Sequence, residues 1–314
     1  MKCWSHIDTK EKGLVNELSD YINRLESSQK IFLPNLRDAD NLYIFSDYSG
    51  NKDQQLISYS ILILDETSVN SFTSTQKYFW EDYALGSKII EYKKLNDGTR
   101  RRALVPFLTL CNKFNGLILT ILFHKNTKSI YTDEMPEKLQ AQIAVWKKTY
   151  VKEKFLRLRD FILLILNGLG RKNQNVLWIT DNDEFVANNL QLETANTILR
   201  ETLYEHLDYM IGEFELKTLE VDSSDNCFEK LCSLSDLIAG GLVDFVGNYH
   251  NANIFPKEGE IAEPILQKLK VNAITNWLSK TQEENSLKKI TIKISETKND
   301  GLFIEAFRFP EIKL

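Results

Sequence analysis

Three aspartates occupy positions where their carboxylates could act together on divalent metal. Asp47 ends the short apolar stretch 41–47, Asp181 follows the apolar stretch 175–180, and Asp236 lies within the apolar segment LSDLIAGGLVDF. Strand ends on one edge of a sheet converge, and a carboxylate from a packed helix can complete the patch. Shared carboxylates can hold two hard cations about 4 Å apart, which clamp phosphate between an attacking water and a leaving oxygen. The pattern predicts a nuclease that uses Mg²⁺ or Mn²⁺.

Each aspartate also has an ordinary structural interpretation. Asp47 could initiate a turn by hydrogen bonding to nearby backbone. Asp181 could cap a helix that begins near Glu184. Asp236 could close a Ser-x-x-Asp capping box with Ser233. We favour the shared role because three unrelated structural roles in this order are a weaker explanation.

Asp183 is a further candidate ligand, and its other interpretation is a solvated loop acid. Together with Asp181 it forms an Asp-x-Asp after a strand, which could bind metal and a sugar diphosphate in a glycosyltransferase. The usual nucleotide-sugar fold begins with β-α-β units. This chain begins differently, so the glycosyltransferase is the weaker alternative.

The opening elements are predicted to be an antiparallel hairpin. Strands are expected at 41–47 and 56–64, and so short a connection excludes a helical crossover. Further strands are expected at 88–95, 116–123, 175–180 and 214–221, and helices at 10–27, 100–114, 136–169, 190–207 and 226–249. This order predicts an α/β fold with an RNase H-like mixed sheet flanked by helices.

The domain organisation is predicted in three parts. Residues 1–40 form an N-terminal helical extension and residues 41–255 the RNase H-like domain. Residues 256–314 form a C-terminal appendage, with a helix at 261–278 and a hairpin of 290–294 and 302–309 across an Asp-Gly turn. The appendage is a candidate surface for a protein partner.

Composition places the chain among ordinary globular proteins. It has 314 residues, 43% of them hydrophobic and 26% charged. The net charge of −5 argues against a surface covered in basic residues for nonspecific nucleic-acid binding, and is compatible with a local basic groove. The four cysteines have no zinc-site spacing and are expected to be reduced thiols. The polar N-terminus lacks a signal-peptide pattern, and no apolar run is long enough to span a bilayer. The sequence therefore predicts a soluble, cytoplasmic protein.

Four features recur here in a recognisable order: FSDYSGN, the E-x-K of Glu91 and Lys93, the strand-ending Asp181, and SLSDLIAGG. Together they resemble a large uncharacterised prokaryotic family assigned to the RNase H-like superfamily of integrases and transposases. The resemblance covers roughly residues 41–249 and implies metal-dependent cleavage of nucleic acid by Asp47, Asp181 and Asp236, with Glu91 as a further candidate. The family's glutamate after the first aspartate is Tyr48 here, which leaves room for altered or lost activity. By association, phage defence or a mobile element is the expected setting.

Basic residues that could follow a phosphate backbone occur in two helical regions and in the E-x-K. Positive charge near phosphate supplies most nonspecific affinity for nucleic acid. The candidates are Lys93, Arg100, Arg101, Lys148, Lys152 and Arg159. Their alternative role is an ordinary solvated face with compensating acids. The competing hypothesis for the whole chain is a catalytically inactive RNase H-like module that binds RNA, DNA or a partner protein.

Overall fold

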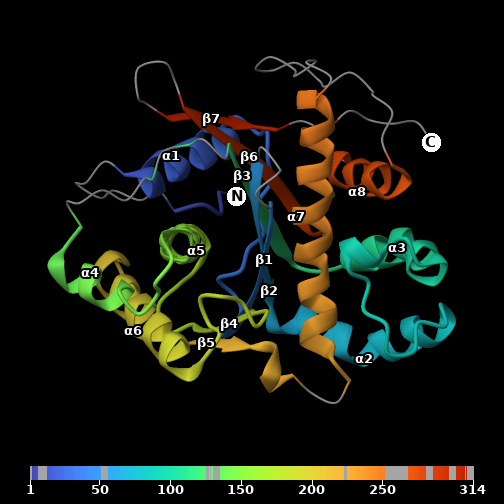
Figure 1. Cartoon of the computed structure of the whole chain (residues 1–314), viewed down its shortest axis with the longest axis horizontal. Coiled ribbons are helices and arrows are strands. Elements are labelled where there is room, and N and C mark those ends of the chain that lie inside the picture. Colours follow the sequence, from blue (N-terminus) through green and yellow to red (C-terminus); the bar gives the residue numbers. More distant parts are fainter. Residues whose placement is uncertain are drawn as a thin grey trace. The chain divides into compact units, whose positions relative to one another are not determined.

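The protein is an α/β structure built on a seven-stranded mixed sheet (Figure 1). The structure, a computed structural model, describes residues 2–5, 13–50, 56–124, 127, 129, 135–222, 225–251, 268–280, 286–296, 302–307 and 309. The strand order is β5-β4-β1-β2-β3-β6-β7. The strands are β1 (Asn41–Ser49), β2 (Leu56–Asp65), β3 (Gly116–His124), β4 (Asn175–Thr180), β5 (Phe214–Thr218), β6 (Lys288–Glu296) and β7 (Leu302–Ala306).

Both strand directions occur in the sheet, as predicted for a mixed fold. The pairs β2–β3 and β6–β7 are antiparallel, whereas β3–β6 and β4–β5 are parallel. The register of β2 on β3 runs from Leu56 opposite His124 to Leu64 opposite Gly116. Almost every residue of β2 and β3 is buried, which explains their nearly continuous apolar sequences.

The helices lie close to the predicted ranges, with one addition. They are α1 (Leu14–Ser27), α2 (Glu66–Asp82), α3 (Gly98–Cys111), α4 (Glu137–Ile143), α5 (Thr149–Leu169), α6 (Asn189–His206), α7 (Cys227–Asn251) and α8 (Leu269–Ser279). The predicted helix 136–169 is divided into α4 and α5. Helix α2 was not predicted because its sequence is mostly polar. Asp65 caps it by accepting a hydrogen bond from the Ser68 N–H at 2.8 Å.

The predicted strand at 88–95 is wrong. Residues 88–91 form no regular structure, and a short 3₁₀ helix, η1 (Tyr92–Lys94), follows them. Ile89, Ile90, Tyr92 and Leu95 are buried without strand pairing. These apolar side chains give the segment the composition of a strand. In a strand, however, successive side chains point to opposite faces, and here the neighbours Ile89 and Ile90 are both buried.

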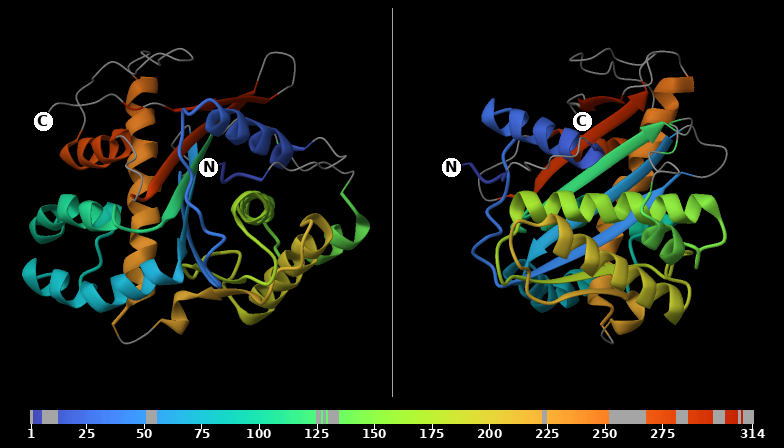
Figure 2. Two further views of the ribbon diagram at one scale, coloured as in Figure 1. Left: turned by 180° about the vertical axis from the view of Figure 1, so that it is seen from behind. Right: turned by 90° about the vertical axis from the view of Figure 1, so that its left-hand side faces the viewer.

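The chain divides into two compact units, each made of two separate segments. Unit 1 contains Met1–Ile44 and Lys128–Val221, and unit 2 contains Phe45–Thr127 and Asp222–Leu314. In unit 2, helix α7 packs on β2, and α2, α3 and α8 lie on the same side of these strands (Figure 1). In unit 1, α5 contacts both α1 and α6, and α6 contacts β5 (Figure 2).

These units differ from the predicted three-part organisation. The C-terminal hairpin of β6 and β7 forms as expected, but β6 pairs along its length with β3. It therefore extends the main sheet instead of forming a separate appendage. Residues 261–267 of the predicted C-terminal helix and the Asp-Gly turn at 298–301 lie outside the described residues.

One described helix is apolar and long enough to cross a membrane. The stretch Cys227–Asn248 of α7 meets this criterion, and 78% of its apolar window is buried inside the protein. A core helix packed on a sheet has the same properties.

Candidate functional site

Strand β1 and helix α7 bring two of the predicted aspartates together in unit 2. The ring of Phe45 on β1 lies 6.0 Å from that of Phe228 on α7, so the Phe45 side chain faces this helix. Side chains two apart in a strand share a face, which places Asp47 on the same side. The buried Ser235 hydroxyl donates to the Phe45 carbonyl at 3.2 Å. The next residue along α7 is Asp236, so this bond fixes the helix beside the strand where the two aspartates meet.

The carboxyl groups of Asp47 and Asp236 lie within hydrogen-bonding reach of each other. Asp236 Oδ2 also accepts a hydrogen bond from the Tyr92 backbone N–H at 2.6 Å. Asp47 Oδ1 accepts one from the Tyr48 N–H at 2.6 Å. Two carboxylates at one place repel each other unless a proton or a cation lies between them.

Burial and neighbouring charge together raise the pKa of Asp236. Desolvation is the main cause, and the negative charge of Glu91 adds to it. The Tyr92 N–H, the positive charge of Lys93 and the hydrogen bond with Asp47 act in the opposite direction and are outweighed. A buried carboxylate whose pKa is raised in this way is typical of functional sites.

The ordinary interpretations of Asp47 and Asp236 are both wrong. Asp47 lies inside β1, which continues to Ser49, so it does not initiate a turn. Helix α7 begins at Cys227, and Asp222 caps it by accepting hydrogen bonds from the backbone N–H groups of Phe228 and Glu229. Ser233 and Asp236 are therefore interior helical residues and form no capping box.

Glu91 and Lys93 flank the Tyr92 N–H that binds Asp236. Glu91 precedes η1 and pairs with Lys94 at 2.7 Å. Lys93 is exposed, and its charge acts on Asp236. The E-x-K thus lies beside the aspartate pair, although the strand predicted to present it does not exist.

Tyr92 is a member of this site that the sequence analysis missed. No local pattern identifies it, because its contact with Asp236 joins residues 144 positions apart. The only sequence signal is indirect and lies in the paired glycines of α7. A Cβ added to Gly240 would come 2.4 Å from Tyr92 Cδ1, so the glycine is what lets the ring approach the helix.

Asp181 and Asp183 belong to unit 1. Asp181 is exposed, and its Oδ1 accepts a hydrogen bond from the Asn182 N–H at 2.7 Å. It does not cap a helix, because α6 begins at Asn189 and its capping residue is Asn188. Burial, reinforced by the charge of Glu184, raises the pKa of Asp183 to about 6.

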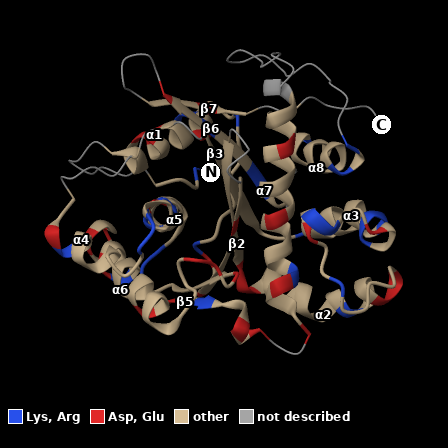
Figure 3. Ribbon diagram, in the orientation of Figure 1, with Lys and Arg blue, Asp and Glu red and all other residues tan. Residues whose placement is uncertain are grey.

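The predicted phosphate-binding residues differ in their availability. Lys93, Arg101 and Lys148 are exposed, and Lys152 is half-buried. The Arg100 side chain donates to the Ile89 carbonyl at 2.7 Å and approaches Asp97. Arg159 donates to the neighbouring Asp160 at 2.7 Å, and both side chains are largely buried. Figure 3 shows the contrast between basic positions on α3 and acidic positions on α7.

The aspartate pair does not form a closed metal cage. Among the described residues, no group of three or more His, Cys, Asp or Glu side chains is arranged to hold a metal ion. Mg²⁺ is commonly bound through one or two carboxylates, with waters and substrate phosphates filling its other positions. The pair therefore fits a hydrated Mg²⁺ or Mn²⁺ on an open site, and it does not by itself fit two fully liganded ions.

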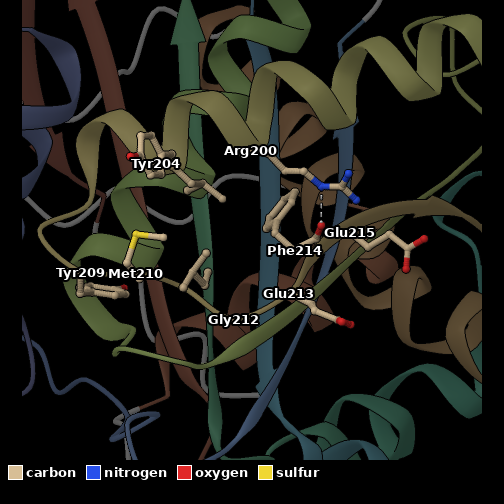
Figure 4. A pocket seen from close by; sticks show the side chains of 10 residues that line it. Arg200, Tyr204, Tyr209, Met210, Gly212, Glu213, Phe214 and Glu215 are labelled. Carbon is tan, nitrogen blue, oxygen red and sulfur yellow. Dashed lines mark hydrogen bonds between the residues drawn. The ribbon is translucent and has the colours of Figure 1, made fainter.

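Unit 1 contains a pocket of about 500 Å³, and none of the residues that line it was predicted as a site residue. Its walls come from α6, the segment 207–213 and the start of β5, with Tyr204, Tyr209 and Met210 among the lining residues (Figure 4). Arg200 donates from Nε to the Phe214 carbonyl at 3.0 Å, drawn as a dashed line in Figure 4. The pocket mixes aromatic side chains with both signs of charge and indicates no particular ligand class.

Comparison of the sequence with the models of known protein families finds no match, and comparison with curated proteins finds none either.

Proposed function

We propose that the protein is a divalent-metal-dependent nuclease with an RNase H-like sheet, in which Asp47 and Asp236 are metal ligands. The observation that supports this most directly is the meeting of the two carboxyl groups between β1 and α7. Both residues were selected from the sequence on chemical grounds, and they lie 189 positions apart in the chain. The raised pKa of Asp236 supports the same conclusion, because a bound cation would offset the burial of this carboxylate and the negative charge of Glu91.

The strand arrangement supports the RNase H-like part of the proposal. The segment β3-β2-β1-β4-β5 of the sheet contains three strands connected in sequence, followed by two parallel strands. The antiparallel pairing of β2 with β3 and the short link from β1 to β2 agree with an opening meander. An RNase H-like sheet has this combination of antiparallel and parallel parts.

Each residue has a definite role in the proposed site. Asp47 and Asp236 supply carboxylate oxygens for Mg²⁺ or Mn²⁺, and the Tyr92 N–H fixes the direction of one Asp236 oxygen. Lys93, which is exposed beside the pair, binds a substrate phosphate oxygen. Glu91 is placed to accept a proton or to bind a metal-coordinated water. The metal, when bound, polarises the phosphate and lowers the pKa of bound water.

The remaining candidates extend the proposal to substrate binding and further ligands. Asp181 and Asp183 are proposed as additional carboxylates of the nuclease. Arg100, Arg101, Lys148, Lys152 and Arg159 are proposed as contacts for RNA or DNA. Among these, Arg101 and Lys148 have the exposed side chains that a phosphate contact requires.

Calorimetric titration with Mn²⁺, paired with cleavage of labelled RNA and DNA, tests the proposal. Wild type is compared with Asp47→Asn, Asp236→Asn and Asp181→Asn, and the exposed Asp82→Asn on α2 serves as the matched control. We expect wild type and the control to bind Mn²⁺ and cleave, and the first two variants to lose both properties. Loss of cleavage in Asp181→Asn would support a role for that carboxylate as well. A wild type that binds no Mn²⁺, even with nucleic acid present, refutes the nuclease.

The alternative is a catalytically inactive module that binds nucleic acid or a partner protein. The lack of a three-residue metal cluster among the described side chains favours it. This module predicts salt-dependent binding of RNA or DNA with no cleavage and with no effect of Asp47→Asn. The same cleavage and binding assays therefore separate the two functions.

A further inference from the structure

Tyr92 is joined to one face of α7 at three points. Its backbone N–H donates to Asp236 at 2.6 Å, its ring lies against Gly240, and its hydroxyl donates to Asp244 Oδ2 at 2.7 Å. Positions 236, 240 and 244 are spaced by four, so they follow one another along a single helical face. The tyrosine therefore spans two turns of α7, and its buried side chain fixes where its N–H points.

A lysine from α8 also contacts this tyrosine. Lys270 Nζ lies 3.9 Å from the centre of the Tyr92 ring and donates to the Tyr92 carbonyl at 3.1 Å. A cation over the face of an aromatic ring is attracted by the negative charge of that face. Desolvation lowers the pKa of Lys270. Lys268, which precedes the first residue of α8, lies 3.7 Å from Asp244, the residue that accepts the hydrogen bond of the Tyr92 hydroxyl.

We propose that Tyr92 is a positioning residue for Asp236, and that Lys270 holds Tyr92 in place for this role. The inference rests on the proposed metal-binding function of Asp236. In this arrangement α8, from the C-terminal part of the chain, contributes to the metal site without touching metal or substrate. Groups that orient a metal ligand typically contribute tenfold or more to metal affinity.

The chain contains a matched control for Lys270. Lys289 on β6 lies 4.2 Å from the centre of the Trp277 ring and donates to the Trp277 carbonyl at 3.0 Å. It thus makes the same pair of contacts with another aromatic residue of unit 2. Replacing either lysine with methionine keeps most of the aliphatic stem and removes the cation and the hydrogen bond. Only Lys270→Met should affect the orientation of Asp236.

Mn²⁺ affinity distinguishes positioning from simple electrostatics, because the two predict opposite signs. If Lys270 acted only as a nearby positive charge, its removal would strengthen the binding of a cation. If it positions Asp236 through Tyr92, we expect Lys270→Met to weaken Mn²⁺ binding about tenfold, as measured by calorimetry. Lys289→Met should bind Mn²⁺ as wild type does. Unchanged or tighter binding by Lys270→Met overturns the inference.

A second measurement does not depend on metal. In protein labelled with ¹⁵N at its 12 tyrosines, the Tyr92 amide proton should resonate far downfield because of its short bond to a carboxyl. We expect this resonance to move upfield in Lys270→Met and to stay in place in Lys289→Met. An unmoved resonance refutes the positioning role. A wild type with the resonance shift but without Mn²⁺ binding refutes the nuclease proposal alone.

Discussion

Replacing Gly240 with alanine should push Tyr92 away from α7. The added Cβ would lie 2.4 Å from Tyr92 Cδ1 and 2.6 Å from Cγ. Nonbonded carbon atoms prefer about 3.5–4.0 Å, so the ring must move by about 1 Å. It cannot move freely, because it is buried and its hydroxyl is bonded to Asp244. Overpacking of this kind costs about 1–3 kcal/mol.

Gly247→Ala supplies the reference for this measurement. Gly247 is in the same helix, and a Cβ added there meets nothing within 4 Å. Both substitutions gain about the same helix propensity, up to ~1 kcal/mol relative to glycine. The difference between the two variants therefore isolates the packing cost against Tyr92. We expect Gly247→Ala to be slightly more stable than wild type, and Gly240→Ala to be less stable than Gly247→Ala by about 1–3 kcal/mol.

Thermal and urea unfolding followed by circular dichroism measure this difference, and Mn²⁺ titration measures its effect on the site. A gap of about 2 kcal/mol corresponds to a difference of several degrees in Tm for a chain of this size. Displacing the Tyr92 N–H should also weaken Mn²⁺ binding in Gly240→Ala alone. Equal stability and equal Mn²⁺ affinity in the two variants would refute the reasoning, since Tyr92 would then not be confined against Gly240.

Three further predictions concern buried charge and the outer strand of unit 1. Asp236→Asn should raise the free energy of unfolding of the metal-free protein at pH 7 by about 1 kcal/mol, because it replaces a buried carboxylate with a neutral amide. In thermal melts, Mn²⁺ should stabilise wild type but not this variant. Because the pKa of Asp183 is raised to about 6, its contribution to stability is lost as pH rises from about 4 to 6, so Asp183→Asn should flatten the pH dependence of Tm in that range. The variant also loses the ion pair with the largely buried Lys154 at 3.4 Å, so it should gain no stability at pH 7. Asn196 bonds the Leu216 N–H at 2.7 Å and the Leu216 carbonyl at 3.0 Å on the outer side of β5. Asn196→Ala should therefore lower the free energy of unfolding in urea by about 1–3 kcal/mol. It should also promote association of the protein, measured by light scattering, because the edge of β5 loses its cover. An unchanged variant would show that water satisfies these backbone groups.

The strands and the aspartate pair could be predicted from sequence because each has a local signal. The apolar stretches that became β1 to β4 end in turn residues or charges, and Asp47 and Asp236 stand out as acids in apolar surroundings. Helix α2 has a weaker signal, because its buried residues Val69, Phe72 and Trp80 are separated by polar ones. Its helical spacing is visible only after its buried face is known.

The environment of Asp236 could not be predicted, because it is assembled from distant segments. Tyr92 precedes Asp236 by 144 positions, and Lys270 follows Tyr92 by 178. The segment around Tyr92 also has no regular periodicity, and its apolar composition was interpreted as a strand. Local patterns indicate where a chain forms helices and strands, whereas a short 3₁₀ turn held by tertiary contacts depends on the partners that it meets.

Tyr48 stands where the resembled family has a glutamate, but its side chain does not affect the aspartate pair directly. Successive side chains in a strand point to opposite faces, so Tyr48 points away from the face on which Asp47 meets Asp236. The Tyr48 ring accordingly lies 6.3 Å from that of Tyr59, which in turn contacts Phe123 on β3. A glutamate at position 48 would lie on that other face and would not join the pair directly. What Tyr48 gives to Asp47 is its backbone N–H, which any residue except proline supplies. A tyrosine at position 48 therefore leaves intact the pair on which the proposed metal site depends.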